Sequence, residues 1–311
     1  MQTLLTLPSN LGYGYIQLEQ SMVGLESKYG DYLFTSHAHS DHTKKLKTRK
    51  LISSNFTSEI IYNKQPDPPP KGITLYNAGH IIGSKQITIN TEQGRIGYTG
   101  DLRLSPRFGI KGAEIIDCDY LIIESTYARS THPPYEEVYE SFRKCLKNKG
   151  IKIIAAYEVG KAQEITKILN EEGITPIVTE KINRLNQYDN LDQVVAGSDE
   201  SKDMLKGEYV AILPPKKVNR EFATNLSVAL NEKVLTIGVT AQPWALWKYD
   251  YAFAISDHSD QRELIEYVEQ VNPEMILTTH GDDIYFANLL RSKGYNSIPY
   301  SKLKRGYTKK K

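Results

Sequence analysis

The sequence has few cysteines, no long apolar run and almost no net charge, and each scarcity excludes a class of protein. Its 311 residues include two cysteines, Cys118 and Cys145, which could form at most one disulfide and lack C-x-x-C spacing. A disulfide framework is therefore excluded, and we expect two buried, reduced thiols. No segment approaches the roughly 20 consecutive apolar residues of a membrane-spanning helix. Because residues 1–10 also lack a basic segment followed by an apolar one, we expect a cytoplasmic protein.

The overall charge says little about partners. Lysine and arginine number 39 against 37 acidic residues, so the net charge of +2 neither requires nor excludes a nucleic-acid partner. Basic residues are concentrated at 44–50, 216–220 and 302–311. Such runs usually form a solvated face. The first run stands out because it directly follows the histidine cluster described next, where a polyanion would approach.

The chain is organised around residues 35–42, which read T-S-H-A-H-S-D-H after an apolar run. Alternate residues of an extended segment point to the same side, so His37 and His39 can bind one ion, while Asp41 and His42 in the following turn reach a second. Zinc and related divalent ions favour imidazole and carboxylate ligands. The alternative is a polar loop that contains histidines by chance.

Further possible ligands follow strand-like segments elsewhere in the chain. They are His80, Asp101, Glu124, His258 and His280. Of the seven histidines, His132 alone fits no such position, and we expect it in a loop. Repeated placement of histidines and carboxylates at strand ends favours a metal site over chance.

Residues 128–249 have a different pattern from the segments on either side. Helical stretches at 135–149 and 160–172 alternate with short apolar runs, which lie at 151–157, 174–179, 209–213 and 233–237. This alternation predicts a mostly parallel sheet with helices on its faces. The run at 251–256 then predicts a return to the first type of structure, followed by helices at 261–271 and 284–293.

The order of the motifs resembles the metallo-β-lactamase fold superfamily and, within it, the β-CASP nucleases. The motifs span most of the chain: S-H-A-H-S-D-H at 36–42, A-G-H-I-I-G-S at 78–84, T-G-D at 99–101, L-I-I-E-S-T-Y at 121–127, S-D-H-S-D at 256–260 and T-T-H-G at 278–281. The first and third occur in many hydrolases of the superfamily, whereas the glutamate run and the last two motifs are more specific.

The resemblance implies an α/β fold: a metallo-β-lactamase four-layer αββα sandwich with a compact inserted β-CASP α/β domain. Residues 1–127 and 250–311 would form the first domain, and residues 128–249 the insertion. A compact insertion is similar to that of short prokaryotic forms, which act as exonucleases in RNA 3′-end processing or are associated with DNA ligase. The chain departs from many superfamily members in lacking a strand-end aspartate before the histidine cluster.

The resemblance also implies a site for two Zn²⁺, with Mn²⁺ as an alternative. One ion would be held by His37, His39 and His80, the other by Asp41, His42 and His280, with Asp101 between them. Two such ions lower the pKa of bound water and stabilise the negative charge that builds on a phosphodiester. The implied activity is hydrolysis of single-stranded DNA or RNA, as an exonuclease in DNA repair or RNA processing.

The expected catalytic residues are Asp41, Glu124 and His258. Glu124 would orient His258 as the general acid that protonates the leaving oxygen. Glu124 and His258 each have a structural alternative, because a carboxylate after a strand is often a turn residue and a histidine at 258 would suit a helix start or the surface.

Substrate contacts are expected from Ser84 beside the metal site, and from Gly160 and Lys161 at a helix N-terminus, where backbone amides bind phosphate. An ordinary helix start at 160 is the alternative. Two other functions fit the fold: a small-molecule metallohydrolase, and a catalytically silent binding subunit. The complete set of possible ligands argues against the second.

Overall fold

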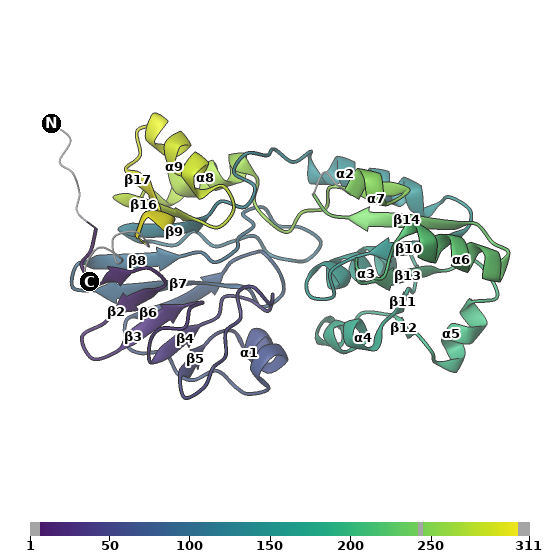
Figure 1. Cartoon of the computed structure of the whole chain (residues 1–311), viewed down its shortest axis with the longest axis horizontal. Helices are drawn as coiled ribbons and strands as arrows, with labels where there is room; N and C mark the ends of the chain where they lie inside the picture. Colours follow the sequence, from purple (N-terminus) through teal and green to yellow (C-terminus); the bar gives the residue numbers. More distant parts are fainter. Residues whose placement is uncertain (1–6, 242–244, 304–311) are drawn as a thin grey trace. The chain divides into compact units, whose positions relative to one another are not determined.

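The chain divides into two units, each with its own sheets (Figure 1). The structure is a computed structural model and describes residues 7–241 and 245–303. Unit 1 contains the residues up to 131 and those from 258 onward, and unit 2 contains residues 132–257. The candidate ligands named above all belong to unit 1.

The first sheet of unit 1 carries the histidine cluster. Its strands β3, β4 and β5 run parallel, with Leu33 of β4 opposite Gly24 and Leu51. Leu33 and Phe34 are fully buried, which fixes the end of β4. The strands, in sheet order, are β1 (Leu11–Gly12), β2 (Tyr15–Gln17), β3 (Met22–Leu25), β4 (Tyr32–Phe34) and β5 (Lys50–Ile52).

The second sheet of unit 1 carries four more candidate ligands, His80, Asp101, Glu124 and His280, at or shortly after the ends of its strands. Strands β6, β7 and β8 form an antiparallel meander, and β8, β9, β16 and β17 continue it in parallel. The strands, in sheet order, are β17 (Ser297–Pro299), β16 (Met275–Thr279), β9 (Tyr120–Glu124), β8 (Gly94–Tyr98), β7 (Lys85–Thr91) and β6 (Ile73–Asn77).

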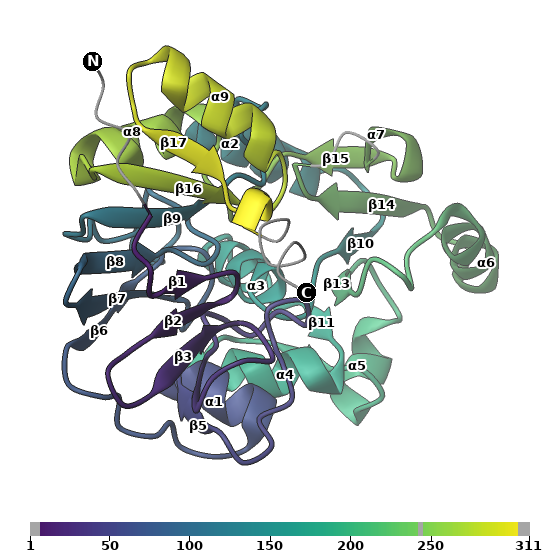
Figure 2. The ribbon, with the colours of Figure 1, turned by 60° about the vertical axis from the view of Figure 1, so that its left-hand side comes forward.

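Apolar side chains pack in two layers around the second sheet. One core cluster joins the two sheets and includes Phe34, Ile87 and Ile122. The other lies between the second sheet and helices α8 (Gln261–Val271) and α9 (Asp283–Ser292), where Leu264 and Val268 are buried one helical turn apart. Helix α1 (Asn55–Tyr62) lies beside β5 (Figures 1 and 2). Unit 1 thus has the α/β layers expected from the sequence.

Unit 2 contains one six-stranded sheet in which all pairings are parallel, as predicted. Its strands, in sheet order, are β12 (Val194–Val195), β11 (Ile177–Val178), β13 (Val210–Leu213), β10 (Ile151–Ala155), β14 (Val234–Val239) and β15 (Tyr251–Phe253). Its helices are α2 (Tyr135–Leu146), α3 (Lys161–Glu171), α4 (Glu180–Asn186), α5 (Asp199–Met204), α6 (Arg220–Leu230) and α7 (Ala245–Lys248), with a 3₁₀ turn at Gln187–Asp189.

The segment at 251–256 differs from its prediction. It was expected to return to the first domain, but β15 pairs in parallel with β14 as the edge strand of unit 2, so the units change after residue 257 and not at 249/250. Strand β15 is not fully buried, and its apolar pattern alone does not specify which sheet it joins.

Two other expectations concern composition. Cys118 and Cys145 are buried free thiols, as predicted, and burial raises the pKa of both, that of Cys118 to about 12. Residues 304–311 of the expected basic tail lie outside the described residues. None of the helices within residues 7–241 and 245–303 is both long and apolar enough to cross a membrane.

Candidate metal centre

The histidine cluster lies in the turn that follows β4. Phe34 is paired in the sheet, and the chain then leaves it through the buried residues Thr35, Ser36 and His37. The turn closes where the His42 amide donates to the His39 carbonyl oxygen at 3.2 Å. His37 and His42 are buried, whereas Asp41 is largely exposed.

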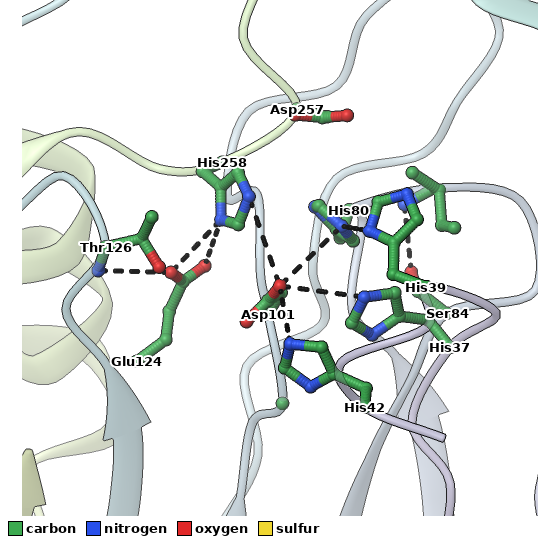
Figure 3. A network of polar contacts seen from close by, with 12 residues as sticks. His37, His39, His42, His80, Ser84, Asp101, Glu124, Thr126, Asp257 and His258 are labelled. Atoms are coloured by element: carbon green, nitrogen blue, oxygen red, sulfur yellow. Dashed lines mark hydrogen bonds and ion pairs between the residues drawn. The ribbon is translucent and has the colours of Figure 1, made fainter. Parts of the chain in front are cut away.

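Asp101 is the centre of the arrangement (Figure 3). It lies in the turn after β8, and imidazole nitrogens from separate turns of unit 1 surround its carboxylate. Oδ2 lies 3.3 Å from Nε2 of His42, 3.6 Å from Nε2 of His37, 3.9 Å from Nε2 of His80 and 4.0 Å from Nε2 of His258. Oδ1 lies 3.8 Å from Nδ1 of His280.

One group of four side chains fits a divalent ion. His37, His39, His80 and Asp101 each offer a ligand atom, and these atoms all lie within 4.8 Å of one another. Zn–N bonds of about 2.0–2.1 Å in tetrahedral geometry place ligand atoms roughly 3.4 Å apart. Nε2 of His80 is 3.2 Å from Nδ1 of His39, and Nε2 of His37 is 3.6 Å from Oδ2 of Asp101.

The buried nitrogen of His37 supports the same conclusion. Its Nε2 atom has no hydrogen-bond partner among the described residues. An unsatisfied buried polar atom costs about 1–3 kcal/mol, and coordination to a metal ion removes that cost. Burial, together with the nearby His80, holds the pKa of His37 well below its usual value, so the ring is neutral, as metal binding requires.

The second expected set of ligands lies on the other side of Asp101. Nε2 of His42 is 3.6 Å from Oδ2 of Asp41, and the rings of His42 and His280 have centroids 5.0 Å apart. His280 adopts the left-handed backbone region, with φ +58°, directly after β16. The structure therefore brings all seven expected ligands to one place.

Glu26 is a buried site residue that was not predicted. It follows β3, in the position where the sequence lacks the expected aspartate, and it accepts four hydrogen bonds. The donors are the backbone amide of Ser36 at 3.1 Å, the Ser36 hydroxyl, Nδ1 of His42 at 2.7 Å and the Tyr98 hydroxyl at 2.7 Å. The signal was present as a carboxylate directly after an apolar strand, the pattern already noted at Glu124.

The charges of Glu26, His42 and Asp101 depend on one another. Burial alone raises the pKa of Glu26, but the charge and hydrogen bond of His42 lower it to about 2. Burial lowers the pKa of His42, but Glu26 and Asp101 raise it to about 12. Burial likewise raises the pKa of Asp101, yet the adjacent imidazoles, His42 first, hold it well below its usual value. Without a metal ion His42 therefore carries a proton, which an ion would displace.

Glu124 and His258 form a pair next to Asp101 (Figure 3). Glu124 ends β9 and is fully buried, and both of its oxygens lie 3.1 Å from Nδ1 of His258. The amides of Leu102 and Thr126 donate to the Glu124 carboxylate at 2.7 and 3.3 Å. Nδ1 of His258 thus faces Glu124, which leaves Nε2 directed at Asp101. The residue that caps α8 is Asp260, not His258.

Two buried arginines hold the turns that carry His80 and His258. Arg107 donates to the carbonyl oxygens of Gly79, at 2.8 Å, and His80. Arg103 donates to the His258 carbonyl oxygen at 3.2 Å. Gly79 has φ +70°, and a Cβ there would lie 2.1 Å from the Arg103 carbonyl oxygen. The segment after Asp101 therefore positions two of the histidines through their backbones.

The expected substrate-binding residues have internal partners. The Ser84 hydroxyl accepts from the Ile81 amide at 3.3 Å, within the turn that carries His80. In unit 2, the Gly160 amide donates to the Gln163 side chain at 2.7 Å. The ammonium group of Lys161 is buried and lies 2.8 Å from Oε2 of Glu164. The expected role of these three residues stays a prediction.

Comparisons with known proteins agree with the motifs. Residues 251–299 match the family model described as "Zn-dependent metallo-hydrolase RNA specificity domain". A "Probable DNA ligase" of Opitutus terrae is 28% identical over 284 residues, covering 84% of this chain and 28% of the relative. The "RNase aCSPSF2" of Saccharolobus solfataricus is 28% identical, covering 76% and 57%. The "Probable RNase MJ4" of Methanocaldococcus jannaschii is 26% identical, covering 82% and 70%.

The chain thus spans 28% of the length of the first of these relatives and 57% of the length of the second. A solved structure of a protein of unknown function from Enterococcus faecalis V583 has the same fold. It superimposes with a TM-score of 0.60 at 16% sequence identity, covering 86% of this chain and 79% of that protein.

Proposed function

The chain belongs to the β-CASP family of metallo-β-lactamase fold proteins, and we propose that it is a metal-dependent hydrolase of phosphodiester bonds in single-stranded nucleic acid. The observation that carries this proposal is the buried group of histidines around Asp101, next to the Glu124–His258 pair. Metal ligands alone would suit many hydrolases. A histidine that is held by a carboxylate and is not needed as a ligand supplies the acid that a phosphodiesterase requires.

His37, His39 and His80 would hold one zinc ion and Asp41, His42 and His280 a second, with Asp101 between them. When bound, such ions supply an activated water molecule and stabilise negative charge on the phosphate. Glu26 keeps Nδ1 of His42 hydrogen-bonded, so that Nε2 faces Asp101. A hydrogen bond from the second ring nitrogen to a carboxylate fixes both the tautomer and the orientation of a metal-binding histidine.

The chain's own residues also provide for the leaving oxygen. Glu124 accepts a hydrogen bond from Nδ1 of His258 and stabilises the imidazolium form of that ring. Nε2 then carries the proton that is transferred to the leaving oxygen. Because the Leu102 and Thr126 amides hold the Glu124 carboxylate, the ring is positioned before the substrate arrives.

The names of the relatives guide the choice of substrate. Two contain the word RNase and one the words DNA ligase, so both RNA and DNA are substrates to be tested. We propose exonuclease action in RNA processing or DNA repair. On this proposal the inserted β-CASP domain, which the sequence places at residues 128–249, corresponds to unit 2, residues 132–257.

The test is digestion of DNA and RNA strands labelled at the 5′ or the 3′ end, with Zn²⁺ or Mn²⁺ supplied and with a chelator. The expected result is metal-dependent release of nucleotides, which His258→Ala lowers about 10²–10⁴-fold, the usual contribution of a general acid. His132→Ala is the matched control, because it removes a histidine in unit 2 and is expected to leave digestion unchanged.

Three outcomes separate the alternatives. Intact strands in every metal, together with rapid turnover of a small thioester, lactone or phosphodiester, would identify a small-molecule metallohydrolase. Absence of bound metal after purification and reconstitution would favour a silent binding subunit. Equal digestion by His258→Ala and the wild type would remove His258 from the mechanism.

A further inference from the structure

The loop that follows the metal centre carries an unusual concentration of positive charge. Five of the seven residues at 44–50 are lysine or arginine, and no acidic residue occurs between Asp41 and Glu59. The four lysines, which are Lys44, Lys45, Lys47 and Lys50, are all exposed. The loop begins two residues after His42, so its charges lie beside the candidate metal centre.

The arginine of this loop holds its shape. Arg49 donates through Nη1 to the Ser27 and Tyr29 carbonyl oxygens at 2.7 and 3.3 Å, and through Nε to the Leu46 carbonyl oxygen at 3.2 Å. It also donates to the carbonyl oxygen of Lys45. The Tyr62 hydroxyl of α1 donates to the Lys44 carbonyl oxygen at 3.1 Å. The backbone is therefore fixed on two sides while the lysine side chains stay at the surface.

The lysines of this loop differ from those exposed lysines that are paired with a carboxylate. In unit 2, Lys202 and Lys206 pair with Asp199 and Asp203 at 2.8 and 2.6 Å. No lysine of the 44–50 loop forms an ion pair with any carboxylate in the part of the chain that the structure describes. The positive charges of Lys45 and Lys47 are therefore available to an anion.

Two of the four lysines already have other contacts. Lys44 donates to the Asp41 carbonyl oxygen at 2.6 Å, and Lys50 lies over the Tyr32 ring at 5.4 Å from its centroid. The ammonium groups of Lys45 and Lys47 form no hydrogen bond or ion pair with any of the described residues. Lys47 adopts the left-handed backbone region, with φ +54°, and the chain turns there before it reaches Arg49.

We propose that the 44–50 loop is a docking surface for the phosphate backbone of a nucleic-acid strand that enters the metal centre, with Lys45 and Lys47 as the phosphate contacts. This inference rests on the proposed function and extends it. Chain geometry limits the Cα atoms of Lys45 and Lys47 to at most about 11 and 18 Å from that of His42. With phosphates about 3.4 Å apart along a stacked strand, these limits place the loop within roughly the first five phosphates from the site.

Salt dependence of binding tests the proposal. A fluorescent 20-nucleotide strand with a nuclease-resistant phosphorothioate backbone, oligo(dT) or oligo(U), is titrated with the full chain at several KCl concentrations. Each phosphate contact on a single strand contributes about 0.7 to the slope of log affinity against log salt concentration. We expect Lys45→Gln/Lys47→Gln to reduce that slope by about 1.4 and to weaken binding several-fold at low salt. The same change is expected for oligo(dT) and for oligo(U).

The matched control is Lys202→Gln/Lys206→Gln, which removes the same net charge from unit 2 and should leave the slope unchanged. Thermal unfolding of both double variants shows whether they fold as the wild type does. An unchanged slope in Lys45→Gln/Lys47→Gln overturns the proposal, and so does an equal reduction in the control, which would indicate a net-charge effect. If the wild type digests labelled strands, either result leaves the proposed function intact. A wild type that neither digests nor binds strands overturns both.

Discussion

Replacing Glu26 with glutamine tests how the buried carboxylate supports the metal centre. Glutamine keeps the size of the side chain but removes its charge and one acceptor oxygen. Because Glu26 accepts bonds from Ser36, His42 and Tyr98, the new NH₂ group must face a donor. One of the four present hydrogen bonds is lost outright, and the orientation of His42 is no longer fixed by charge.

The magnitude follows from the contacts. Replacing a carboxylate that orients a metal-binding histidine typically weakens metal affinity about 10–100-fold, which corresponds to about 1.4–2.8 kcal/mol of binding free energy. For the metal-free protein, lowering of the Glu26 pKa from 4.5 to about 2 corresponds to a stabilisation on the order of 3 kcal/mol. Since the folded pKa lies below the unfolded value, this stabilisation is fully present above pH 4.5 and is lost as the pH falls toward 2.

Two assays follow from these values. Zinc affinity is measured against a competing chelator, and we expect Glu26→Gln to weaken it 10–100-fold. Urea unfolding in chelator should give a free-energy difference between wild type and variant that narrows as the pH falls below 4.5. Glu19→Gln, at an exposed position before β3, is the control. Equal zinc affinity in Glu26→Gln and Glu19→Gln would refute the reasoning, because the carboxylate would then not position His42.

Three further predictions concern the same centre. Arg107→Lys keeps the charge but loses the planar group that reaches two carbonyl oxygens, so zinc affinity should fall about tenfold, whereas the same change at exposed Arg184 should leave it unaltered. Gly79→Ala should lower the free energy of unfolding in urea by more than Gly173→Ala does. Both glycines have positive φ, but of the two only Gly79 has a backbone oxygen 2.1 Å from an added Cβ. Equal losses of unfolding free energy would contradict this. Removal of metal should lower the free energy of unfolding by about 2.7 kcal/mol relative to protein held at 100 times the dissociation constant, and His37→Ala should abolish most of that difference in calorimetry.

The helices with regular apolar spacing could be predicted closely. The expected helix at 261–271 has the bounds of α8, and its buried residues repeat at intervals of three and four. The strands at 121–124 and 209–213 were also found near their expected positions. In these segments the local pattern and the packing agree, because one face of each element is buried in the core.

Membership of a sheet was harder to predict. The strand at 251–253 has no fully buried residue, and an apolar run carries no information about its neighbour. Parallel pairing with β14 is a long-range contact made through backbone groups, which all residues share. Its side chains therefore gave no indication that it belongs to unit 2.

The sequence by itself determined which side chains are available to a metal ion, because histidine and aspartate placed at strand ends are a local feature that residue type and spacing define. Only the tertiary structure decided how they are held. The contacts of Glu26 with His42 and of Arg107 with the His80 turn join residues far apart in the chain. Their chemistry, a carboxylate on a ring nitrogen and a guanidinium on carbonyl oxygens, appears only when folding brings those segments together.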